Sequence, residues 1–172
     1  IYKFLDTYQK ERIEAFLHPE NLSLSGNYQV WQSKVAMGSG GFFGKGLFQG
    51  TQKSLDFIPV QQSDFIFSVV VEELGFLGCL LIIILLMALI IRLFYVAYRA
   101  STPFSALIAV GVGGMLLFQT FMNIFMNVGL LPVMGLTLPF FSYGGTSIVT
   151  MFAALGIAAG VRMREKPSWL QN

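Results

Sequence analysis

The second half of the chain is dominated by long stretches without charge. Residues 74–91 are 18 consecutive residues without a charged side chain, and they are rich in Leu and Ile. This is about the length that a helix needs to cross a hydrocarbon core of ~30 Å. We therefore expect one membrane-spanning helix here, and we expect it to begin at Phe65.

A longer uncharged stretch follows, from residue 100 to residue 161. Its 62 residues are too many for one helix, so the chain must turn back within it. Two prolines, Pro132 and Pro139, and several glycines mark the interruption. The pattern predicts two further spanning helices, near 104–128 and 143–161, joined by an uncharged loop.

The first part of the chain mixes polar and apolar positions. "YQKERIEAFLHPE" has the pattern of a short amphipathic helix that ends near Pro19. In "NYQVWQSKVAM", Asn27 is placed to cap a second helix, on which Tyr28, Trp31 and Val35 recur at helical spacing. Such a face fits a helix at the level of the lipid head groups, and it fits an ordinary packed loop helix equally well.

Composition agrees with a membrane protein. Apolar residues make up 55% of the 172 residues and charged residues only 12%, which is unusual for a soluble domain. The chain opens on "IYKFLD" without Met, so we expect residues 1–6 to end a preceding helix and the chain to be part of a longer protein. Cys79 is the single cysteine, which excludes a disulfide within the chain. The net charge of +2 does not indicate nucleic-acid binding.

The basic residues predict the orientation in the membrane. They outnumber the single acid, Glu165, in the linker after the first span and in the tail after Val161, which makes both cytoplasmic. The expected fold is an all-α polytopic membrane protein. Residues 1–64 form a large extracytoplasmic loop with short helices, and residues 65–172 form a three-helix transmembrane region with a cytoplasmic C-terminal tail. The basic residues are Arg92, Arg99, Arg162, Arg164 and Lys166.

A glycine-rich stretch, "GSGGFFGKG" at residues 38–46, requires unusual backbone angles or close backbone approach. A phosphate-binding loop is excluded by spacing, because Ser39 and Gly46 stand where that motif needs Gly and Ser or Thr. Two interpretations stay open. The stretch is a flexible turn at the membrane interface, or its backbone and Lys45 face an anionic head group, with Lys53 extending that surface.

Three acids lie at or within the first span. Asp64 either caps the start of the helix or acts as a base toward a lipid-linked substrate at the membrane surface. On a helix, Glu72 would lie ~12 Å and ~80° away from Asp64, which argues against a glycosidase-like pair. We expect Glu72 and Glu73 to be buried structural groups, with Arg12 or a residue outside this chain as partner.

The uncharged loop at residues 129–142 suits a re-entrant loop or a tight outer cap, because non-helical backbone at this depth needs protein or a wet cavity around it. A discontinuous helix of a transporter has similar features. On the last helix, Gly156 and Gly160 form a GxxxG pattern that favours close helix packing.

Two blocks of sequence resemble the SEDS family (shape, elongation, division and sporulation), which includes RodA, FtsW and SpoVE. "NIFMNVGLLPVMGLTLPFFSYGGTS" is similar to the C-terminal signature of that family, and "GNYQVWQSKVAMGSGGFFGKGLFQGTQ" with "FIPVQQSDFIFSVVVEELGFLG" is similar to its large outer loop and following helix. The resemblance covers nearly all of this chain, but only the second half of a ten-helix family member. "FQGTQ" and Met134 favour the RodA branch.

The resemblance implies a peptidoglycan glycosyltransferase that polymerises lipid II, with undecaprenyl pyrophosphate as the leaving group. The family's essential acid corresponds to Asp64, although Val60, Gln62 and Ser63 replace the usual Glu, His and Thr around it. A divalent cation, Mg²⁺ or Mn²⁺, is implied without identified ligands, and no organic cofactor is expected. The residues expected at the substrate or shaping its cavity are Arg12, Lys45, Gln52, Lys53, Asp56, Ser142, Tyr143, Gly144 and Gly145.

The expected location is the bacterial cytoplasmic membrane. The expected partners are lipid II, the membrane itself, a class B penicillin-binding protein with transpeptidase activity, and other proteins of the elongation or division complex. Nucleic acid is not expected. A lipid II flippase and a non-catalytic scaffold for a transpeptidase are the alternative functions.

Overall fold

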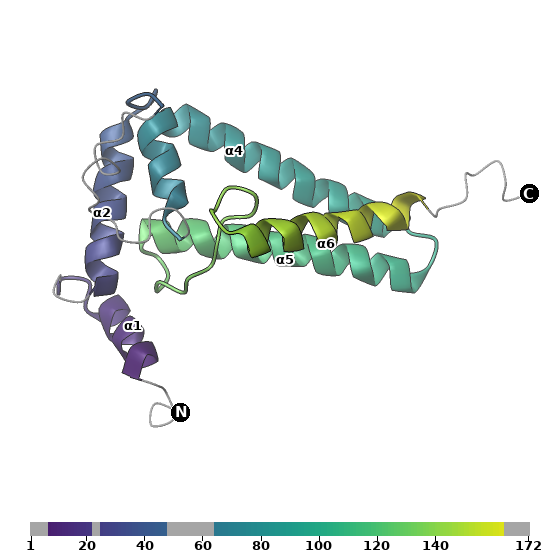
Figure 1. Ribbon diagram of the computed structural model, residues 1–172, viewed down its shortest axis with the longest axis horizontal. Coiled ribbons are helices and arrows are strands. Elements are labelled where there is room, and N and C mark those ends of the chain that lie inside the picture. Colours follow the sequence, from purple (N-terminus) through teal and green to yellow (C-terminus); the bar gives the residue numbers. More distant parts are fainter. Residues whose placement is uncertain (1–6, 22–24, 48–63, 164–172) are drawn as a thin grey trace, which may run out of the picture.

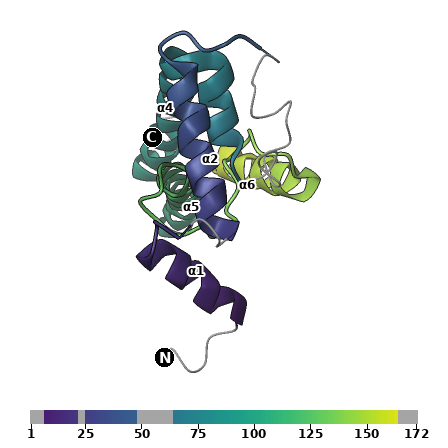
Figure 2. The ribbon, with the colours of Figure 1, turned by 90° about the vertical axis from the view of Figure 1, so that its left-hand side faces the viewer.

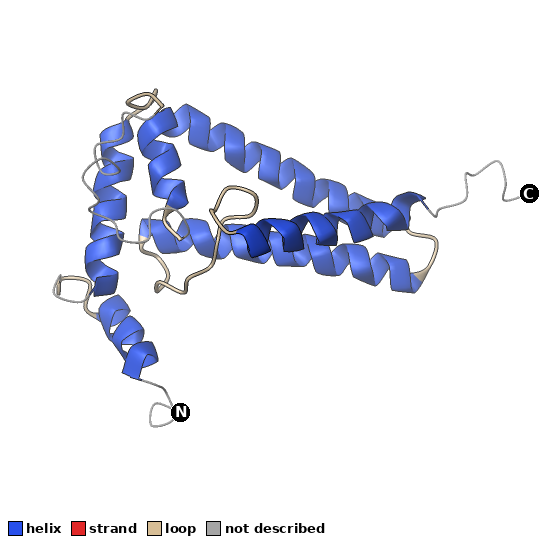
Figure 3. Ribbon diagram, in the orientation of Figure 1, coloured by secondary structure: helices blue, strands red, loops and turns tan. Residues whose placement is uncertain are grey.

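The computed structural model describes residues 7–21, 25–47 and 64–163, and every regular element in these residues is a helix (Figures 1 and 3). This confirms the all-α prediction. The elements are α1 (Thr7–Leu17), α2 (Ser25–Gly40), α4 (Ile66–Arg99), α5 (Pro103–Val128) and α6 (Gly145–Met163).

Helix α4 begins within one residue of its predicted start, but the expectation of one continuous helix is wrong. Gly75 has φ 71° and ψ −171°, which breaks α4 into a short first segment and a long second segment. The two segments meet at a sharp corner at the top of Figure 1. The loop after α2 holds this corner in place through contacts described below.

Helix α5 matches its predicted limits because strong local signals mark both ends. The Thr102 hydroxyl accepts a hydrogen bond from the Ser105 N–H at 3.2 Å, and Pro103 opens the first turn. At the other end Gly129 takes a left-handed conformation (φ 80°), and the N–H of Leu130 donates to Phe125 O at 2.9 Å. This is a Schellman motif, which stops the helix while satisfying its last carbonyls.

Two of the three expected spans coincide with helices that could cross a membrane. Helices α4, with 34 residues, and α5, with 26, are long and apolar enough to cross a membrane. Helix α6 is present near its predicted position, but its apolar stretch, Gly145–Val161, is shorter. Its crossing of the membrane stays a prediction.

The two long helices lie together near their short connection and diverge toward the other end (Figure 1). The space between the diverging ends holds the first segment of α4 and the loop before α6. There Phe67 from the first segment and Leu138 from the loop share a buried cluster with Cys79, Ile82 and Leu86 of the second segment. The break in α4 thus lets one helix supply two sides of the same core.

Helix α6 packs on the middle of the α4–α5 pair through Met151 and Ala158, which are buried with Leu116 of α5. The glycines of its GxxxG pattern do not take part. A Cβ atom built on Gly156 or Gly160 meets no neighbour within 4 Å in the described part of the chain. The expected close packing at these glycines is therefore not found here.

The first two helices confirm the predicted elements, but α2 presents a different face to the protein than its apolar pattern suggests. Ser33, Ala36 and Gly40 are buried, whereas Trp31 is 47% exposed. Small residues face inward because α2 lies close against α4 and α5, across their open end (Figure 2). The proposed cap is also wrong: Asn27 lies inside α2, and its side chain donates to the carbonyl oxygens of residues 18 and 21.

Candidate functional site

Asp64 lies immediately before the N-cap residue of α4, Phe65, and its side chain is half-buried. The N-cap makes no side-chain hydrogen bond, and no backbone N–H of α4 donates to the Asp64 side chain in the described part of the chain, so the interpretation of Asp64 as a hydrogen-bonding cap is wrong. A favourable interaction with the helix dipole stays a prediction. Within the described residues, no hydrogen bond or ion pair engages the Asp64 carboxylate. The described part of the chain therefore leaves both carboxylate oxygens without a partner.

The main chain of Asp64, in contrast, is held firmly. Its carbonyl oxygen accepts hydrogen bonds from the side-chain amides of Asn123 and Asn127 of α5, at 3.0 and 3.1 Å. The two asparagines are four residues apart and therefore share one face of the helix. Both are 0% exposed, so the pair forms a buried polar contact near the C-terminal end of a mostly apolar helix.

Further hydrogen bonds fix the two amides. Asn123 Nδ2 also donates to Leu136 O at 2.6 Å, and Asn127 Nδ2 also donates to Asn123 O at 2.9 Å. From α2, the buried hydroxyl of Ser33 donates to Asn127 O at 3.0 Å. Ser33, Asn123 and Asn127 are not among the site residues expected from the sequence. The available signal was two amides at helical spacing within an apolar span, where polar groups are costly.

The loop between α5 and α6 passes beside the Asp64 carboxylate. Gly135 has φ 70°, and a Cβ atom built there would lie 3.5 Å from Asp64 Oδ2. The loop is packed against protein, since Leu138 is buried and its N–H donates to the hydroxyl of buried Ser142 at 2.7 Å. This agrees with the expected re-entrant loop or cap, and it places backbone on one side of the carboxylate.

The four residues of the "SYGG" stretch have different environments. Ser142 holds the loop, which fits its expected role in shaping the cavity. Tyr143 is 79% exposed, Gly144 O accepts the first helical hydrogen bond of α6 from Ile148, and Gly145 is the exposed first residue of that helix. Ser142 alone among the four has a buried side chain.

The glycine-rich loop after α2 lies in the break of α4 and satisfies backbone groups on both sides of it. The N–H groups of Lys45 and Gly46 donate to the carbonyls of Glu72 and Glu73, at 3.0 and 3.1 Å. In the other direction, the N–H of Phe76 donates to Gly41 O at 3.0 Å, and that of Leu77 donates to Phe42 O at 3.3 Å. Helix ends leave such groups without partners, so the loop makes the break possible.

The glycines are needed because the two backbones touch. A Cβ atom on Gly44 would overlap Glu73 O, and one on Gly75 would overlap Gly44 N. Gly44 and Gly75 also have positive φ angles of 77° and 71°, which other residues rarely adopt. The expected unusual backbone angles and close approach are both confirmed.

The side chain of Lys45 also takes part in the contact between the loop after α2 and the break in α4. Its ammonium group lies 2.8 Å from Glu72 Oε1, and the Glu72 side chain is 0% exposed. The predicted burial of Glu72 and Glu73 is confirmed. The ion-pair partner of Glu72 in the described residues is Lys45 and not the suggested Arg12, while a partner outside this chain stays a prediction. Arg12 instead donates to Val133 O in the loop before α6. A lysine already paired with a buried carboxylate is poorly placed to contact a lipid head group.

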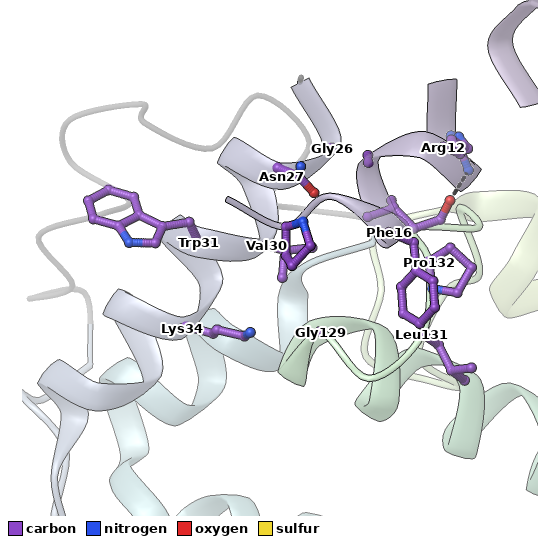
Figure 4. Close-up of a pocket in the computed structure, with 13 residues that line it drawn as sticks. Arg12, Phe16, Gly26, Asn27, Val30, Trp31, Lys34, Gly129, Leu131 and Pro132 are labelled. Atoms are coloured by element: carbon purple, nitrogen blue, oxygen red, sulfur yellow. Dashed lines mark hydrogen bonds between the residues drawn. The ribbon is translucent and has the colours of Figure 1, made fainter. Parts of the chain in front are cut away.

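Arg12 lines a pocket of about 110 Å³ between α1, α2 and the start of the same loop (Figure 4). Trp31 and Lys34 line it from α2. Lys34 lies over the C-terminal end of α5, since a Cβ atom on Gly129 would come 2.7 Å from its Nζ atom. A cation is stabilising there because the carbonyl end of a helix is partly negative.

Three expected substrate contacts, Gln52, Lys53 and Asp56, lie outside the described residues, as do Val60, Gln62 and Ser63 beside Asp64. A divalent cation needs several oxygen or nitrogen ligands. Residues 7–21, 25–47 and 64–163 contain no group of three His, Cys, Asp or Glu side chains that could hold a metal ion. The described residues thus place the Asp64 carboxylate beside the loop before α6 and do not by themselves form a metal site.

Comparison with known proteins gives consistent results. Residues 1–167 match the profile of a family described as cell cycle proteins, FtsW/RodA/SpoVE. The peptidoglycan glycosyltransferase MrdB of Escherichia coli K12 is 42% identical over 159 residues, which are 92% of this chain and 43% of MrdB. A probable peptidoglycan glycosyltransferase FtsW of Bacillus subtilis is 40% identical over 166 residues, 96% of this chain and 41% of that protein.

Solved structures show the same arrangement of helices. A chain of a peptidoglycan synthase complex that coordinates polymerization and crosslinking matches 96% of this chain and 45% of its own length, with a TM-score of 0.72 and 32% identity. A mutant of the rod shape determining protein RodA from Thermus thermophilus matches 78% of this chain and 41% of its own, with a TM-score of 0.60 and 36% identity. The chain spans less than half the length of these relatives.

Proposed function

This chain belongs to the family of cell cycle proteins that includes FtsW, RodA and SpoVE, and from that membership we propose that it is the C-terminal half of a peptidoglycan glycosyltransferase that polymerises lipid II. One observation carries the proposal. The half-buried Asp64 carboxylate has no partner among the described residues, while its main chain is fixed by two buried amides. A structural carboxylate would be expected to make a bond, whereas a base must keep its oxygens available.

In the proposed reaction the Asp64 carboxylate accepts the proton of the sugar 4-hydroxyl on the acceptor lipid II. The hydroxyl oxygen forms a bond to the anomeric carbon of the growing glycan chain, and the bond from that carbon to undecaprenyl pyrophosphate breaks. A fixed carboxylate at the edge of a membrane protein suits this step because the sugars of a lipid-linked substrate lie at the membrane surface. Fixing the base relative to the substrate also removes an entropic part of the barrier.

The substrate contacts are part of the proposal. Arg12 and the pocket around it lie against the loop that also passes Asp64, which supports a role for Arg12 near the sugar or pyrophosphate. Gln52, Lys53 and Asp56 are proposed as further substrate contacts in the loop before α4. A divalent cation is also proposed, bound with the help of residues beyond the described ones. No step above depends on that cation.

The protein is a membrane protein, and its finer placement is proposed. We place it in the bacterial cytoplasmic membrane, with residues 1–64 outside and the C-terminus in the cytoplasm. The match to a chain of a peptidoglycan synthase complex supports a partner that carries out crosslinking, such as a class B penicillin-binding protein. Identities of 42% and 40% to MrdB and FtsW leave the elongation branch as a proposal that rests on Met134 and "FQGTQ".

A lipid II flippase is the second candidate. The break at Gly75 and the non-helical loop before α6 favour it, because discontinuous helices and irregular backbone line the substrate path in many transporters. A scaffold without catalytic activity is the third candidate. Only the first function requires the Asp64 carboxylate to take part in bond formation.

The test compares Asp64→Asn with the unaltered full-length protein that carries this chain. Each is purified in detergent, checked for folding, and given fluorescent lipid II, and the glycan polymer is measured on a gel. We expect Asp64→Asn to lose at least about 100-fold in rate, within the range of a lost general base. The matched control is Glu11→Gln, the same chemical change at an exposed position of α1, and it should polymerise normally.

Two results would contradict the proposal. If Asp64→Asn polymerises as well as the unaltered protein, Asp64 is not the base. If no version polymerises and reconstituted vesicles translocate labelled lipid II, the protein is a flippase.

A further inference from the structure

We propose that Asn123 and Asn127 are positioning residues that set the orientation of the Asp64 carboxylate for the reaction. The inference rests on the proposed function, because it assigns no chemistry of its own to the asparagines. Neither amide touches the carboxylate; both bind the carbonyl oxygen of the same residue. They act on the base through its backbone.

The geometry restrains a single peptide group from two sides. A carbonyl oxygen has two lone pairs, and here two amide donors from successive turns of α5 reach it at 3.0 and 3.1 Å. Two donors fix the plane of the peptide group that follows Asp64, where one donor would leave it free to rotate about a single hydrogen bond. The direction in which the side chain leaves Cα is then fixed as well.

Asn123 also sets the distance between the carboxylate and the neighbouring loop. Its Nδ2 atom donates to Leu136 O at 2.6 Å in addition to Asp64 O. The adjacent residue of the loop, Gly135, is the one whose added Cβ atom would lie 3.5 Å from Asp64 Oδ2. One amide group therefore joins the base to the backbone that forms one side of its site.

The two amides are themselves held in place, as a positioning group requires. Asn127 is joined to Asn123 O and, through Ser33, to α2, and all three side chains are 0% exposed. The helix end does not need them as caps, because the left-handed Gly129 and the N–H of Leu130 already satisfy the last turn of α5. The asparagine amides instead donate to Asp64 O, to Leu136 O in the loop and to Asn123 O within α5.

The test uses Asn123→Asp and Asn127→Asp in the full-length protein, with kcat and KM for lipid II measured in detergent. Each change keeps the shape of the side chain and removes the Nδ2 donor. We expect kcat to fall about 10- to 100-fold, as expected for a displaced reacting group, while KM changes less than about twofold. The matched control is Gln119→Glu, which makes the same amide-to-acid change one turn earlier on the same helix. The Oε1 atom of Gln119 is buried and has no hydrogen-bond partner in the described part of the chain.

Folding is measured for every variant by thermal unfolding in detergent, and rates are expressed per folded molecule. Should both aspartate variants fail to fold, Asn127→Ser replaces them, because it removes one donor and leaves both bonds of Asn123 intact. The proposal is overturned if kcat per folded molecule in the Asn variants equals that of Gln119→Glu. It is equally overturned if KM rises while kcat holds.

The same experiment includes Asp64→Asn, so that the two proposals fail separately. If Asp64→Asn is active, the proposed base is wrong and the asparagines have nothing to orient. If Asp64→Asn is inactive and the asparagine variants match their control, the proposed function stands and only the positioning role is lost. In the double variant Asp64→Asn with Asn123→Asp, the rate should fall no further than in Asp64→Asn alone, since residues that act as one unit are not additive.

Discussion

Backbone groups are satisfied by different kinds of partner at the break in α4 at Gly75 and at the start of α4 at Asp64. At both points a helix begins against a segment that is distant in the sequence, and backbone groups need partners. At Gly75 the partners are backbone groups of the loop after α2, in two opposite pairs. At Asp64 they are side-chain amides of α5.

The difference determines which substitutions each region tolerates. A join made by backbone groups depends on how closely two chains approach, so its essential residues are the glycines that allow the approach. A contact made by side-chain amides depends on the identity of two side chains. It should tolerate substitutions at neighbouring positions better than the close backbone contact at Gly75 does. An added side-chain atom should therefore disrupt the break at Gly75, whereas the loss of an amide donor should disrupt the contact at Asp64.

The largest effect is expected for Gly75→Ala. The new methyl group would overlap Gly44 N, and the φ of 71° with ψ of −171° is a conformation open almost only to glycine. Strain alone costs about 1–3 kcal/mol, and the overlap with backbone adds to it, so we expect little folded protein. The readout is the yield of monodisperse protein and its unfolding temperature in detergent.

Gly38→Ala is the control for that change. Gly38 is helical and has open space around it, so alanine there should be neutral or stabilising by up to about 1 kcal/mol. Equal yields of the two variants would show that the close approach at Gly75 is not needed for the break.

A smaller effect is expected at the ion pair in the same region. Lys45→Met leaves the Glu72 carboxylate buried without its cation, which costs about 3–5 kcal/mol when a buried pair loses one partner. The double variant Lys45→Met with Glu72→Met removes both charges and should recover most of that loss. Chemical unfolding in detergent measures both, and a double variant no more stable than Lys45→Met alone would refute the coupling.

The smallest effect is expected at Ser33, which contacts Asn127 but not Asp64. Ser33→Ala removes the hydrogen bond from α2 to Asn127 O at 3.0 Å and leaves both donors to Asp64 in place. The loss should be about 1 kcal/mol, the usual net value of one hydrogen bond, with little change in activity. A fall in activity comparable to that of Asn127→Asp would mean that the contact with α2 also orients the Asp64 carboxylate.

Much of the helical framework could be predicted from the sequence, because uncharged runs and strong end signals coincide there. Thr102, Pro103 and Gly129 mark both ends of α5 to within a residue. The break in α4 could not be predicted in the same way. A single glycine is tolerated inside a helix, and Gly75 breaks α4 only because the loop after α2 lies against it.

The site could be predicted in part. Asp64 was identified through a resemblance, and chemistry alone left a hydrogen-bonding helix cap as an alternative that the structure excludes. The pairing of Lys45 with Glu72 joins residues 27 positions apart, and no local pattern reports such a contact. The spacing of Asn123 and Asn127 in an apolar span indicates a polar contact, but it does not identify the partner, because that partner is a backbone oxygen and every position of a chain has one.

The hydrogen bonds that hold position 64 in place do not depend on its side chain. The bonds at this residue are made by its carbonyl oxygen, which every amino acid possesses, so the backbone would be held in the same way whichever side chain stood there. A lineage that no longer needed the chemistry could lose the acid and keep the architecture. Under the proposed function, selection for an acid at this position would therefore act through turnover more than through these backbone hydrogen bonds.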